Sequence, residues 1–331
     1  MSRRAALGSL AGLIAQCTAA DNPDDNVPLK IGGGEIQVSF DSASFDVPRA
    51  ALLDWVRVAA RAVTAYYGRY PVPRARVHIH ATGGRGVRNG VSYGDDGVWC
   101  RISVGRHTTA SDLHDDWTLT HEMVHFGFPS LPRRHHWMEE GMATYVEPIA
   151  RAQVGNLTAE QVWGGMLRDM HQGLPAPGDQ GLDNTHTWGR TYWGGALFCL
   201  LADIGIRRHT HNTLGLEDAL RAINRAGGTI DVDWSLRRTL DTGDRATHGH
   251  VLTNLHRKMG ARPVAVDLPA LWKRLGVRWQ DSRIVFDASA PEAAAREAIM
   301  RGSARTLPES RRFGPHGQDS DPKSTLGARE R

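Results

Sequence analysis

The chain has 331 residues, of which 40% are hydrophobic and 23% are charged, with a formal net charge of +4. This composition is typical of a soluble globular protein, and the length suffices for one large hydrophobic core or two smaller ones. The arginines are scattered along the chain and form no basic and aromatic pattern, so the sequence argues against a nucleic-acid partner.

The first 20 residues have the order of an export signal. Arg3 and Arg4 precede an apolar run at residues 5–15, which is too short to cross a bilayer as a permanent helix, and small residues follow it. The two arginines also resemble a twin-arginine signal, and lipidation of Cys17 is allowed although Gln16 suits it poorly. We predict an exported protein that is periplasmic, extracellular or lipid-anchored to the cell envelope, with membrane contact only if Cys17 is lipidated.

Hydrophobicity patterns predict a small mixed α/β lobe over residues 28–130. Residues 35–40 and 75–81 alternate in hydrophobicity like strands. Between them, Pro48 opens a helical pattern that stops at Pro71.

The rest of this lobe leads to a third strand and a second helix. A glycine-rich loop is predicted at residues 82–97, followed by a strand at residues 99–104. This strand is either a sheet edge that could pair with an extended peptide or a buried strand. A helix is predicted at residues 111–126, because polar residues can cap its start and Gly127 with Pro129 ends it.

Residues 131–278 are predicted to form a helical lobe, with a loop at residues 181–189. From residue 279 to residue 331 the apolar periodicity fades, and a disordered tail is predicted. The expected helices cover residues 136–149, 191–206, 216–225, 250–259 and 268–275.

Residues 121–125 read HEMVH. On a helix, His121 and His125 lie on one face and can present two imidazole nitrogens to a single ion, while Glu122 lies beside that face and can hold a metal-bound water. With 16 histidines in the chain, such a pattern arises by chance in roughly a few per cent of sequences of this length. A third ligand is therefore needed to support a zinc site.

Two glutamates on the next predicted helix compete for that position, since hydrolytic zinc needs three protein ligands and an open site for water. Glu140 is favoured over Glu139 because Gly141 allows the helices at the site to approach closely. Glu140 also shares a helical face with Thr144 and Glu147, whereas Glu139 would point away.

HEMVH followed by WMEEGMATYVE at residues 137–147 resembles the gluzincin metallopeptidases, in particular the M1 aminopeptidase family, whose second motif reads WLNEGFAxYxE. The resemblance implies one Zn²⁺ per chain, held by His121, His125 and Glu140, with Glu122 as the general base. It also implies a thermolysin-like zincin fold of the α+β class, with the active-site cleft between a small mixed α/β lobe and a helical lobe.

The resemblance covers roughly residues 75–205 and departs from the family in places. The interval from His125 to Glu140 is shorter than usual, which a shorter loop between the helices explains. The large N-terminal β-domain of M1 enzymes cannot fit before the motif, so a reduced form is expected. The family's GxMEN motif, which binds the substrate's amino group, is absent, and Asp95 or Asp96 could take that role; exopeptidase and endopeptidase activity both stay open.

Residues 191–197, TYWGGAL, are similar to the YxKGA segment of M1 enzymes, whose tyrosine hydroxyl stabilises the tetrahedral intermediate. Gly194 stands where the family has lysine. Apart from the resemblance, Tyr192 places a phenol at the start of an apolar helix, where its hydroxyl can donate a hydrogen bond to an oxyanion. The alternative is that Tyr192 packs beside Trp188 and Trp193.

Supporting side chains are expected around the zinc histidines, because their second ring nitrogen usually has a partner. Glu147 is the first candidate and Thr144 the second, with a surface glutamate as the alternative for Glu147. The strand histidines His78 and His80 are expected at most to line the cleft.

Two further histidines and the cysteines are interpreted without a role in the zinc site. His135 and His136 are expected to be solvated in the loop between the helices. Cys100 and Cys199 could form a disulfide in an oxidising compartment or remain free buried thiols.

Together these residues predict a zinc metallopeptidase acting on a peptide or protein substrate. Zinc would activate a water, Glu122 would transfer its proton, and Tyr192 would share the oxyanion with zinc. The rival prediction is a non-catalytic exported zinc-site protein that binds peptides or cell-surface ligands. That rival predicts loss of Glu122 or a ligand, and all are present; the oligomeric state is not indicated.

Overall fold

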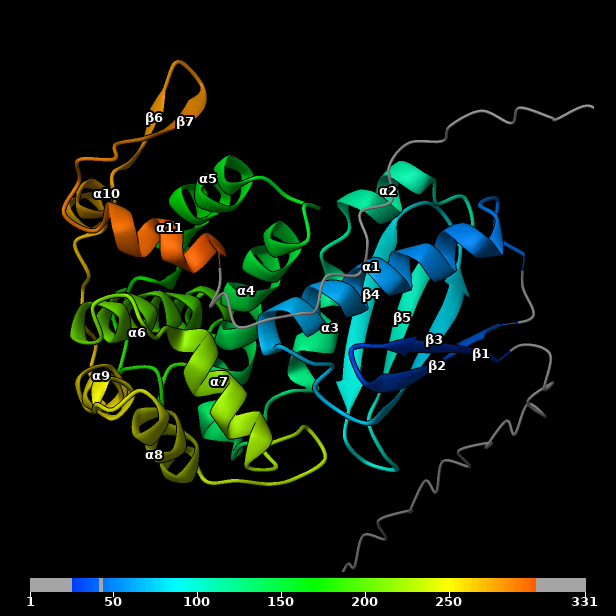
Figure 1. Ribbon diagram of the computed structural model, residues 1–331, viewed down its shortest axis with the longest axis horizontal. Coiled ribbons are helices and arrows are strands. Elements are labelled where there is room, and N and C mark those ends of the chain that lie inside the picture. The colour runs from blue at the N-terminus through cyan, green and yellow to red at the C-terminus, as the bar shows by residue number, and fades with distance from the viewer. Residues whose placement is uncertain (1–25, 42–43, 302–331) are drawn as a thin grey trace, which may run out of the picture.

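The computed structural model describes residues 26–41 and 44–301. A β-sheet and helix α1 (Arg49–Tyr67) form one half of the molecule, and a group of helices forms the other (Figure 1). The predicted α+β fold class is therefore confirmed. The predicted export signal at residues 1–20, including Cys17, lies outside the described residues and stays a prediction.

Five strands form one mixed sheet: β1 (Val27–Ile31), β2 (Gly34–Phe40), β3 (Arg74–Thr82), β4 (Val87–Tyr93) and β5 (Trp99–Gly105). Their spatial order is β1-β2-β3-β5-β4. β2, β3 and β5 run parallel to one another, whereas β1 and β4 pair antiparallel at the two edges.

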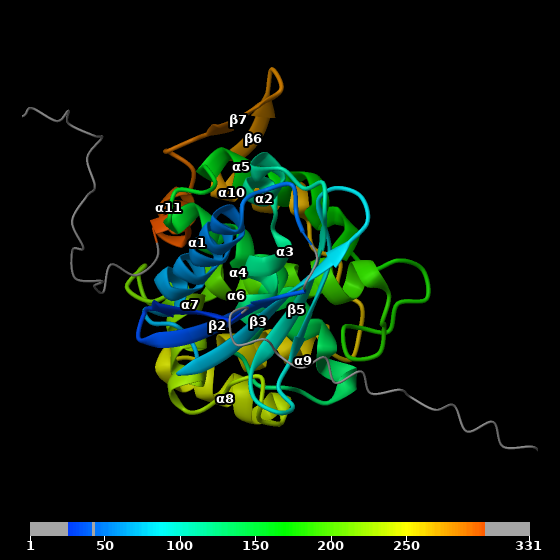
Figure 2. The ribbon, with the colours of Figure 1, turned by 90° about the vertical axis from the view of Figure 1, so that its right-hand side faces the viewer.

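Alternation along β3 determines which face of the sheet is buried. Val77 and Ile79 are fully buried, whereas His78 and His80 point to the opposite face and are partly exposed. Helix α1 follows the predicted helical pattern and contributes buried side chains such as Val56 to the core. Figure 2 looks at the sheet half from its outer side, with the helical half behind it.

The glycine-rich stretch at residues 82–97, predicted as a loop, contains β4. Its side chains are only partly buried because β4 lies at an edge of the sheet, so the alternation that marks a half-buried strand is weak. β5, predicted at residues 99–104 as either an edge strand or a buried strand, is an inner strand between β3 and β4. The edge position next to the helical half belongs to β4.

The single helix predicted at residues 111–126 is two helices, α2 (Ala110–Asp115) and α3 (Thr118–His125). Asp116 between them is extended, and its carboxylate accepts hydrogen bonds from the backbone amides of Thr118 and Leu119 at 3.0 and 3.1 Å. This carboxylate satisfies amides at the start of α3, so the HEMVH helix begins anew with its own direction.

The helical half contains the helices that the sequence predicted and others, such as α5 and α8, that it did not. α5 carries two glycines, and the only large apolar residues of α8 are Leu236 and Leu240. The elements are α4 (His136–Gln153), α5 (Ala159–Asp169), the π-helix η4 (Arg190–Gly194), α6 (Gly195–His209), α7 (Leu216–Arg225), α8 (Leu236–Ala246), α9 (Val251–Met259) and α10 (Leu268–Leu275).

The disordered tail predicted from residue 279 is wrong up to residue 301. β6 (Val277–Gln280) and β7 (Arg283–Phe286) form a hairpin, and α11 (Ala293–Arg301) packs against α4 and α6. α11 gives little hydrophobic signal because alanines and a buried arginine make up much of its packed face. Residues 302–331 lie outside the described residues.

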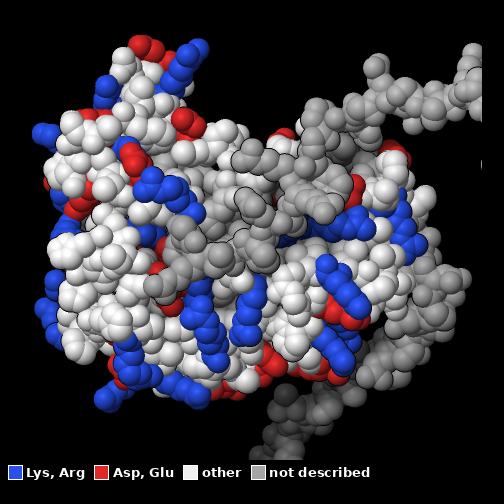
Figure 3. Space-filling model, in the orientation of Figure 1, with Lys and Arg blue, Asp and Glu red and all other residues white. Residues whose placement is uncertain are grey.

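The core is continuous between the two halves, because one buried hydrophobic cluster includes side chains of the sheet, α1 and the helical half. Cys100 and Cys199 are both buried and free. None of the described helices is long and apolar enough to span a membrane. On the face drawn in Figure 3, basic and acidic side chains are interspersed over both halves.

α4 and the start of α6 approach each other closely. A Cβ added to Gly141 would lie 2.2 Å from Gly195 Cα, and a Cβ added to Gly195 would lie 2.1 Å from Trp137 O. Gly141 was predicted to permit a close approach at the site, and its contact is with the backbone at the start of α6. Glycines at this crossing hold α4 directly against the turn that follows η4.

One added methyl group tests how tight this crossing is. We expect Gly195→Ala to lower the free energy of unfolding by about 1–3 kcal/mol, because one of the helices must move to admit the new Cβ. Urea unfolding followed by circular dichroism measures the change. Gly165→Ala in α5, whose nearest neighbour would be Arg168 Nη2 at 4.0 Å, is the control and should be neutral or slightly stabilising. Wild-type stability of Gly195→Ala would show that the crossing is loose.

Candidate metal centre

The structure brings the three predicted zinc ligands together. His121 and His125 lie one turn apart on α3, and Glu140 reaches them from the first turns of α4. Glu140 Oε2 lies 3.1 Å from His121 Nε2 and 3.7 Å from His125 Nε2. One donor atom of each residue lies within 4.8 Å of the other two. Their role as ligands stays a prediction, but two imidazoles and one carboxylate at this spacing fit a zinc ion with an open position.

Glu140 and His125 neutralise one another in a largely buried place. Burial opposes ionisation of Glu140, but hydrogen bonds from His121 and His125 outweigh it and hold the pKa of Glu140 well below its usual range. Burial likewise opposes protonation of His125, but the hydrogen bond and charge of Glu140 raise the pKa of His125 to about 9. A proton on His125 thus balances the Glu140 carboxylate where a cation would otherwise do so.

Glu139 lies away from the two histidines, as its place on the helix predicted. Its Oε1 accepts a hydrogen bond from the backbone amide of Leu131 at 3.0 Å, and its Oε2 lies 3.0 Å from His136 Nδ1. Adjacent residues on a helix point about 100° apart, so Glu139 and Glu140 cannot serve the same ion. Through the contact with Leu131, Glu139 instead connects the loop before α4 to the first turn of that helix.

The prediction that His135 and His136 are solvated is confirmed for His136, whose side chain is 52% exposed, and is wrong for His135, which is buried. His136 lies over both glutamates, with Nε2 3.3 Å from Glu140 Oε1, and it therefore holds the carboxylate oxygen that the other histidines do not contact. The spacing of four residues from His136 to Glu140 on one helix was the available signal. His135 is buried and pairs with Asp183 at 2.9 Å.

Glu122 is held by a strand residue that the sequence analysis missed. Ser92 of β4 donates its hydroxyl to Glu122 Oε2 at 2.6 Å and lies 2.9 Å from the backbone oxygen of Glu122. Gly90 lets β4 pass close to α3, because a Cβ there would lie 2.6 Å from Glu122 Cγ and 2.8 Å from Thr118 Cγ2. The stretch was read as a loop, so nothing in the sequence placed either residue beside Glu122.

A cleft of about 780 Å³ runs between β4 and the helical half. Its lining includes all three candidate ligands, Glu122, Ser92 and Tyr192. Asp95, one of two candidates for binding an amine, also lines this cleft, whereas Asp96 pairs with Arg76 at 3.3 Å and is almost fully exposed. The outer edge of β4 carries backbone groups that no strand of the sheet pairs.

Tyr192 reaches the cleft from η4, where the sequence predicted the start of an α-helix. Its ring is nearly parallel to that of His121, with centroids 6.3 Å apart, and to that of Trp188, with centroids 5.6 Å apart. Burial and the negative charge of Glu140 raise the pKa of Tyr192 to about 12. The phenol is therefore a neutral hydrogen-bond donor at physiological pH, and the predicted packing beside Trp188 is present as well.

The residues predicted to support the zinc histidines have other surroundings. Glu147 pairs with Arg151 at 3.0 Å, and burial raises the pKa of Glu147 to about 7 despite that partner. Within the described ranges no hydrogen bond joins Glu147 or Thr144 to either histidine. Arg151 also donates to the backbone oxygen of His114, so this buried pair anchors α4 to α2.

A second, more apolar pocket of about 340 Å³ opens beside the cleft. Trp117, His121 and Tyr192 line both spaces. Thr144 and Glu147 lie on the wall that α4 contributes, and the other lining residues include Leu157, Val162, Met166, Trp188 and Trp193. The pocket can take an apolar side chain of a molecule bound in the cleft.

The chain was compared with known proteins by sequence and by fold. No family model matches the sequence. No curated protein matches it either.

Solved structures of similar fold do exist. One is an aminopeptidase N family protein from Idiomarina loihiensis, with a TM-score of 0.57 and 14% sequence identity over 77% of this chain and 49% of that chain. Another is an M1 zinc metallopeptidase from Deinococcus radiodurans, with a TM-score of 0.48 and 16% identity over 74% of this chain and 52% of that chain. The chain spans about half the length of each. The first likeness shows that the chain shares the fold of this part of an aminopeptidase N family protein.

Proposed function

We propose that the protein is a zinc-dependent metallopeptidase that hydrolyses peptide bonds in the cleft beside β4. The observation that carries the proposal is the position of Glu140, which reaches both HEMVH histidines from a second helix. The shared fold of an aminopeptidase N family protein supports it. That the protein is a gluzincin is part of the proposal.

A few side chains around the three candidate ligands would carry out the reaction. A zinc ion on His121, His125 and Glu140 would supply a Lewis acid and an acidified water. Glu122 accepts the proton of the attacking water and delivers it to the leaving amine. Ser92 donates to one Glu122 oxygen and thereby orients the other. The hydroxyl of Tyr192 donates a hydrogen bond to the oxyanion that develops on the scissile carbonyl.

The surroundings of the cleft favour an extended peptide substrate. The outer edge of β4 offers backbone donors and acceptors along the cleft, which bind main chain with little selectivity. The apolar pocket next to Tyr192 adds a preference for a large apolar side chain near the scissile bond. Asp95 is the candidate for a substrate amino group, so cleavage near a free N-terminus is included in the proposal.

Replacing the proposed base separates catalysis from metal binding. We expect the wild-type protein to cleave a mixture of peptides, mostly beside large apolar residues, and Glu122→Gln to lower the rate at least about 100-fold, because the amide cannot accept the proton. Zinc per chain should not change, since Glu122 is not a ligand. Mass spectrometry of the peptides and metal analysis provide the measurements.

Two results would count against this proposal. Equal cleavage by wild type and Glu122→Gln would place the activity elsewhere. A zinc-loaded wild-type protein that cleaves none of the peptides but binds them would favour the rival, a non-catalytic exported protein that uses the site for recognition.

Removal of one hydroxyl tests the role of Tyr192. We expect Tyr192→Phe to lower kcat by about 100-fold with little change in KM, because the hydroxyl is needed only when the oxyanion forms. Steady-state kinetics with a peptide identified in the mixture measures both constants. If kcat is unchanged, Tyr192 serves only to pack against Trp188.

Zinc must displace the proton that Glu140 stabilises on His125, so binding should depend on pH. A zinc ligand has to be a neutral imidazole, and the pKa of His125 is raised to about 9. We expect full affinity above this pH and a fall of about tenfold per unit below it. Calorimetry in buffers of different ionisation enthalpy counts the protons released. His121→Ala is the blank for zinc bound elsewhere, and an affinity that is constant from neutral to alkaline pH would contradict the coupling.

A further inference from the structure

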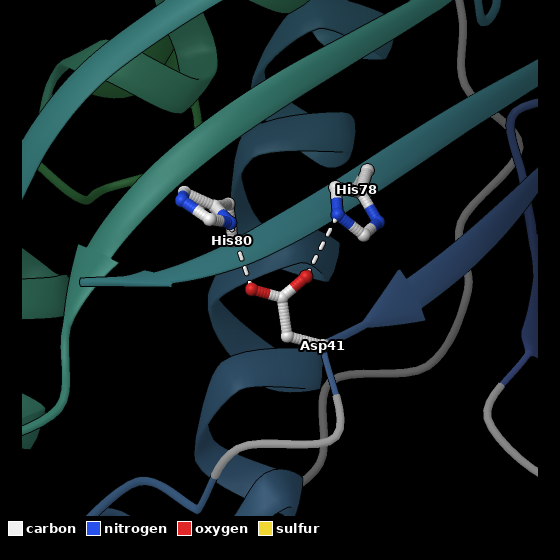
Figure 4. Close-up of side chains that lie close together, drawn as sticks. All are labelled: Asp41, His78 and His80. Atoms are coloured by element: carbon white, nitrogen blue, oxygen red, sulfur yellow. Dashed lines mark ion pairs between the residues drawn. The ribbon is translucent and has the colours of Figure 1, made fainter. Parts of the chain in front are cut away.

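A second cluster of metal-binding side chains lies on the outer face of the sheet, on the side away from α1 (Figure 4). Asp41 follows β2, and His78 and His80 come from β3. Asp41 Oδ1 lies 3.1 Å from His78 Nε2, and Asp41 Oδ2 lies 2.7 Å from His80 Nδ1. One donor atom of each residue lies within 4.8 Å of the other two.

The strand makes this arrangement rigid. Residues two apart on a strand point to the same face, so His78 and His80 present their rings side by side. β3 is paired on both sides, by β2 and β5, and Ile79 between the histidines is fully buried. The three side chains are between 28% and 35% exposed, so an ion from solvent can reach them.

Neighbouring groups hold two of the three side chains in place. The backbone amide of Ala81 donates to Asp41 Oδ2 at 3.0 Å. Ser39 Oγ lies 3.0 Å from His78 Nδ1. A hydroxyl can accept from Nδ1–H, and a metal ion could then take the place of the His78 Nε2 proton that faces Asp41 Oδ1 at 3.1 Å. Partners of this kind on the second ring nitrogen are typical of metal-ligating histidines.

A third cluster of similar composition is less suited to a metal ion. His135, Asp183 and His256 also bring three potential ligand atoms together. There the Arg134 guanidinium donates to His135 Nε2 at 2.9 Å, and the Trp137 indole donates to Asp183 Oδ1 at 2.9 Å. The Arg134 guanidinium thus occupies one ring nitrogen of His135 and adds a positive charge that opposes a cation.

We propose that Asp41, His78 and His80 form a binding site for a divalent transition-metal ion of the zinc type, separate from the centre in the cleft. Two imidazole nitrogens and one carboxylate oxygen are ligands that zinc accepts, with the remaining position left to water. A bound ion would join the end of β2 to β3 and so stabilise the sheet half in its folded form. The proposal does not depend on peptidase activity.

Zinc counting on the full chain tests this site. Equilibrium dialysis against zinc should give about two ions per chain for the wild type and about one for His80→Asn, because each site binds one ion. His107→Asn is the matched control, since His107 pairs with Asp46 at 2.9 Å on an exposed surface, and no third potential ligand joins them among residues 26–41 and 44–301. It should bind as much zinc as the wild type. Equal zinc in His80→Asn and wild type would overturn the proposal.

The same experiment distinguishes this site from the cleft. His121→Ala should lose the cleft ion and keep the ion on the sheet. If the cleft binds no zinc at all, the wild type should hold one ion that His80→Asn loses and His121→Ala keeps, which still supports the site. Circular dichroism checks that His80→Asn is folded, and His78→Asn replaces it if it is not.

Ser39, which positions the ring of His78, provides a further test of the site. In the His121→Ala protein, Ser39→Ala should weaken zinc binding about tenfold without abolishing it, because the second partner of His78 is lost while the ligands remain. Zinc should also raise the melting temperature of His121→Ala, and this shift should disappear when His80→Asn is added. An unchanged affinity in Ser39→Ala together with an unchanged shift in the double variant would overturn the site.

Discussion

The carboxylate of Glu140 lies between the imidazoles of His121 and His125, and the arrangement of the helices around it depends on this contact. α3 and α4 supply the three groups, and a loop held by the bond from the Leu131 amide to Glu139 joins them. On its other side α4 meets α6 at a glycine crossing with no space for a Cβ. That crossing also positions η4, so one helix places both the third ligand and the tyrosine of the cleft.

Several ionisable groups are buried together here, which is costly unless they neutralise one another. The hydrogen bond between Glu140 and His121 and the ion pair between Glu140 and His125 reduce that cost, and His136 lies 3.3 Å from the second oxygen of Glu140. Glu122 is not part of this group, because its carboxylate accepts a hydrogen bond from Ser92 of β4. The base is thus bound to the strand edge where a peptide would lie, and the ligands are bound to the helices. A substrate in the cleft would contact both parts.

The sequence predicted the features that repeat along one element. HEMVH, the choice of Glu140 over Glu139, and the helices at residues 49–67, 216–225 and 268–275 follow from helical periodicity and from prolines and glycines at the ends. Features that depend on tertiary contacts were missed. β4 is an exposed edge, Asp116 breaks a helix through its side chain, and α11 packs with alanines. Ser92 joins the site only through folding. His136 with Glu140, and Glu147 with Arg151, are instead pairs four residues apart on α4, so their spacing was a signal in the sequence.

Anomalous diffraction at the zinc absorption edge, from crystals of the full chain grown with zinc, tests the central claim most directly. The account predicts a peak between His121 Nε2, His125 Nε2 and the Glu140 carboxylate, with both histidine rings and the helices in their present positions. A crystal with zinc in solution but no peak at these three side chains would contradict it. So would a peak at which Glu139 takes the place of Glu140.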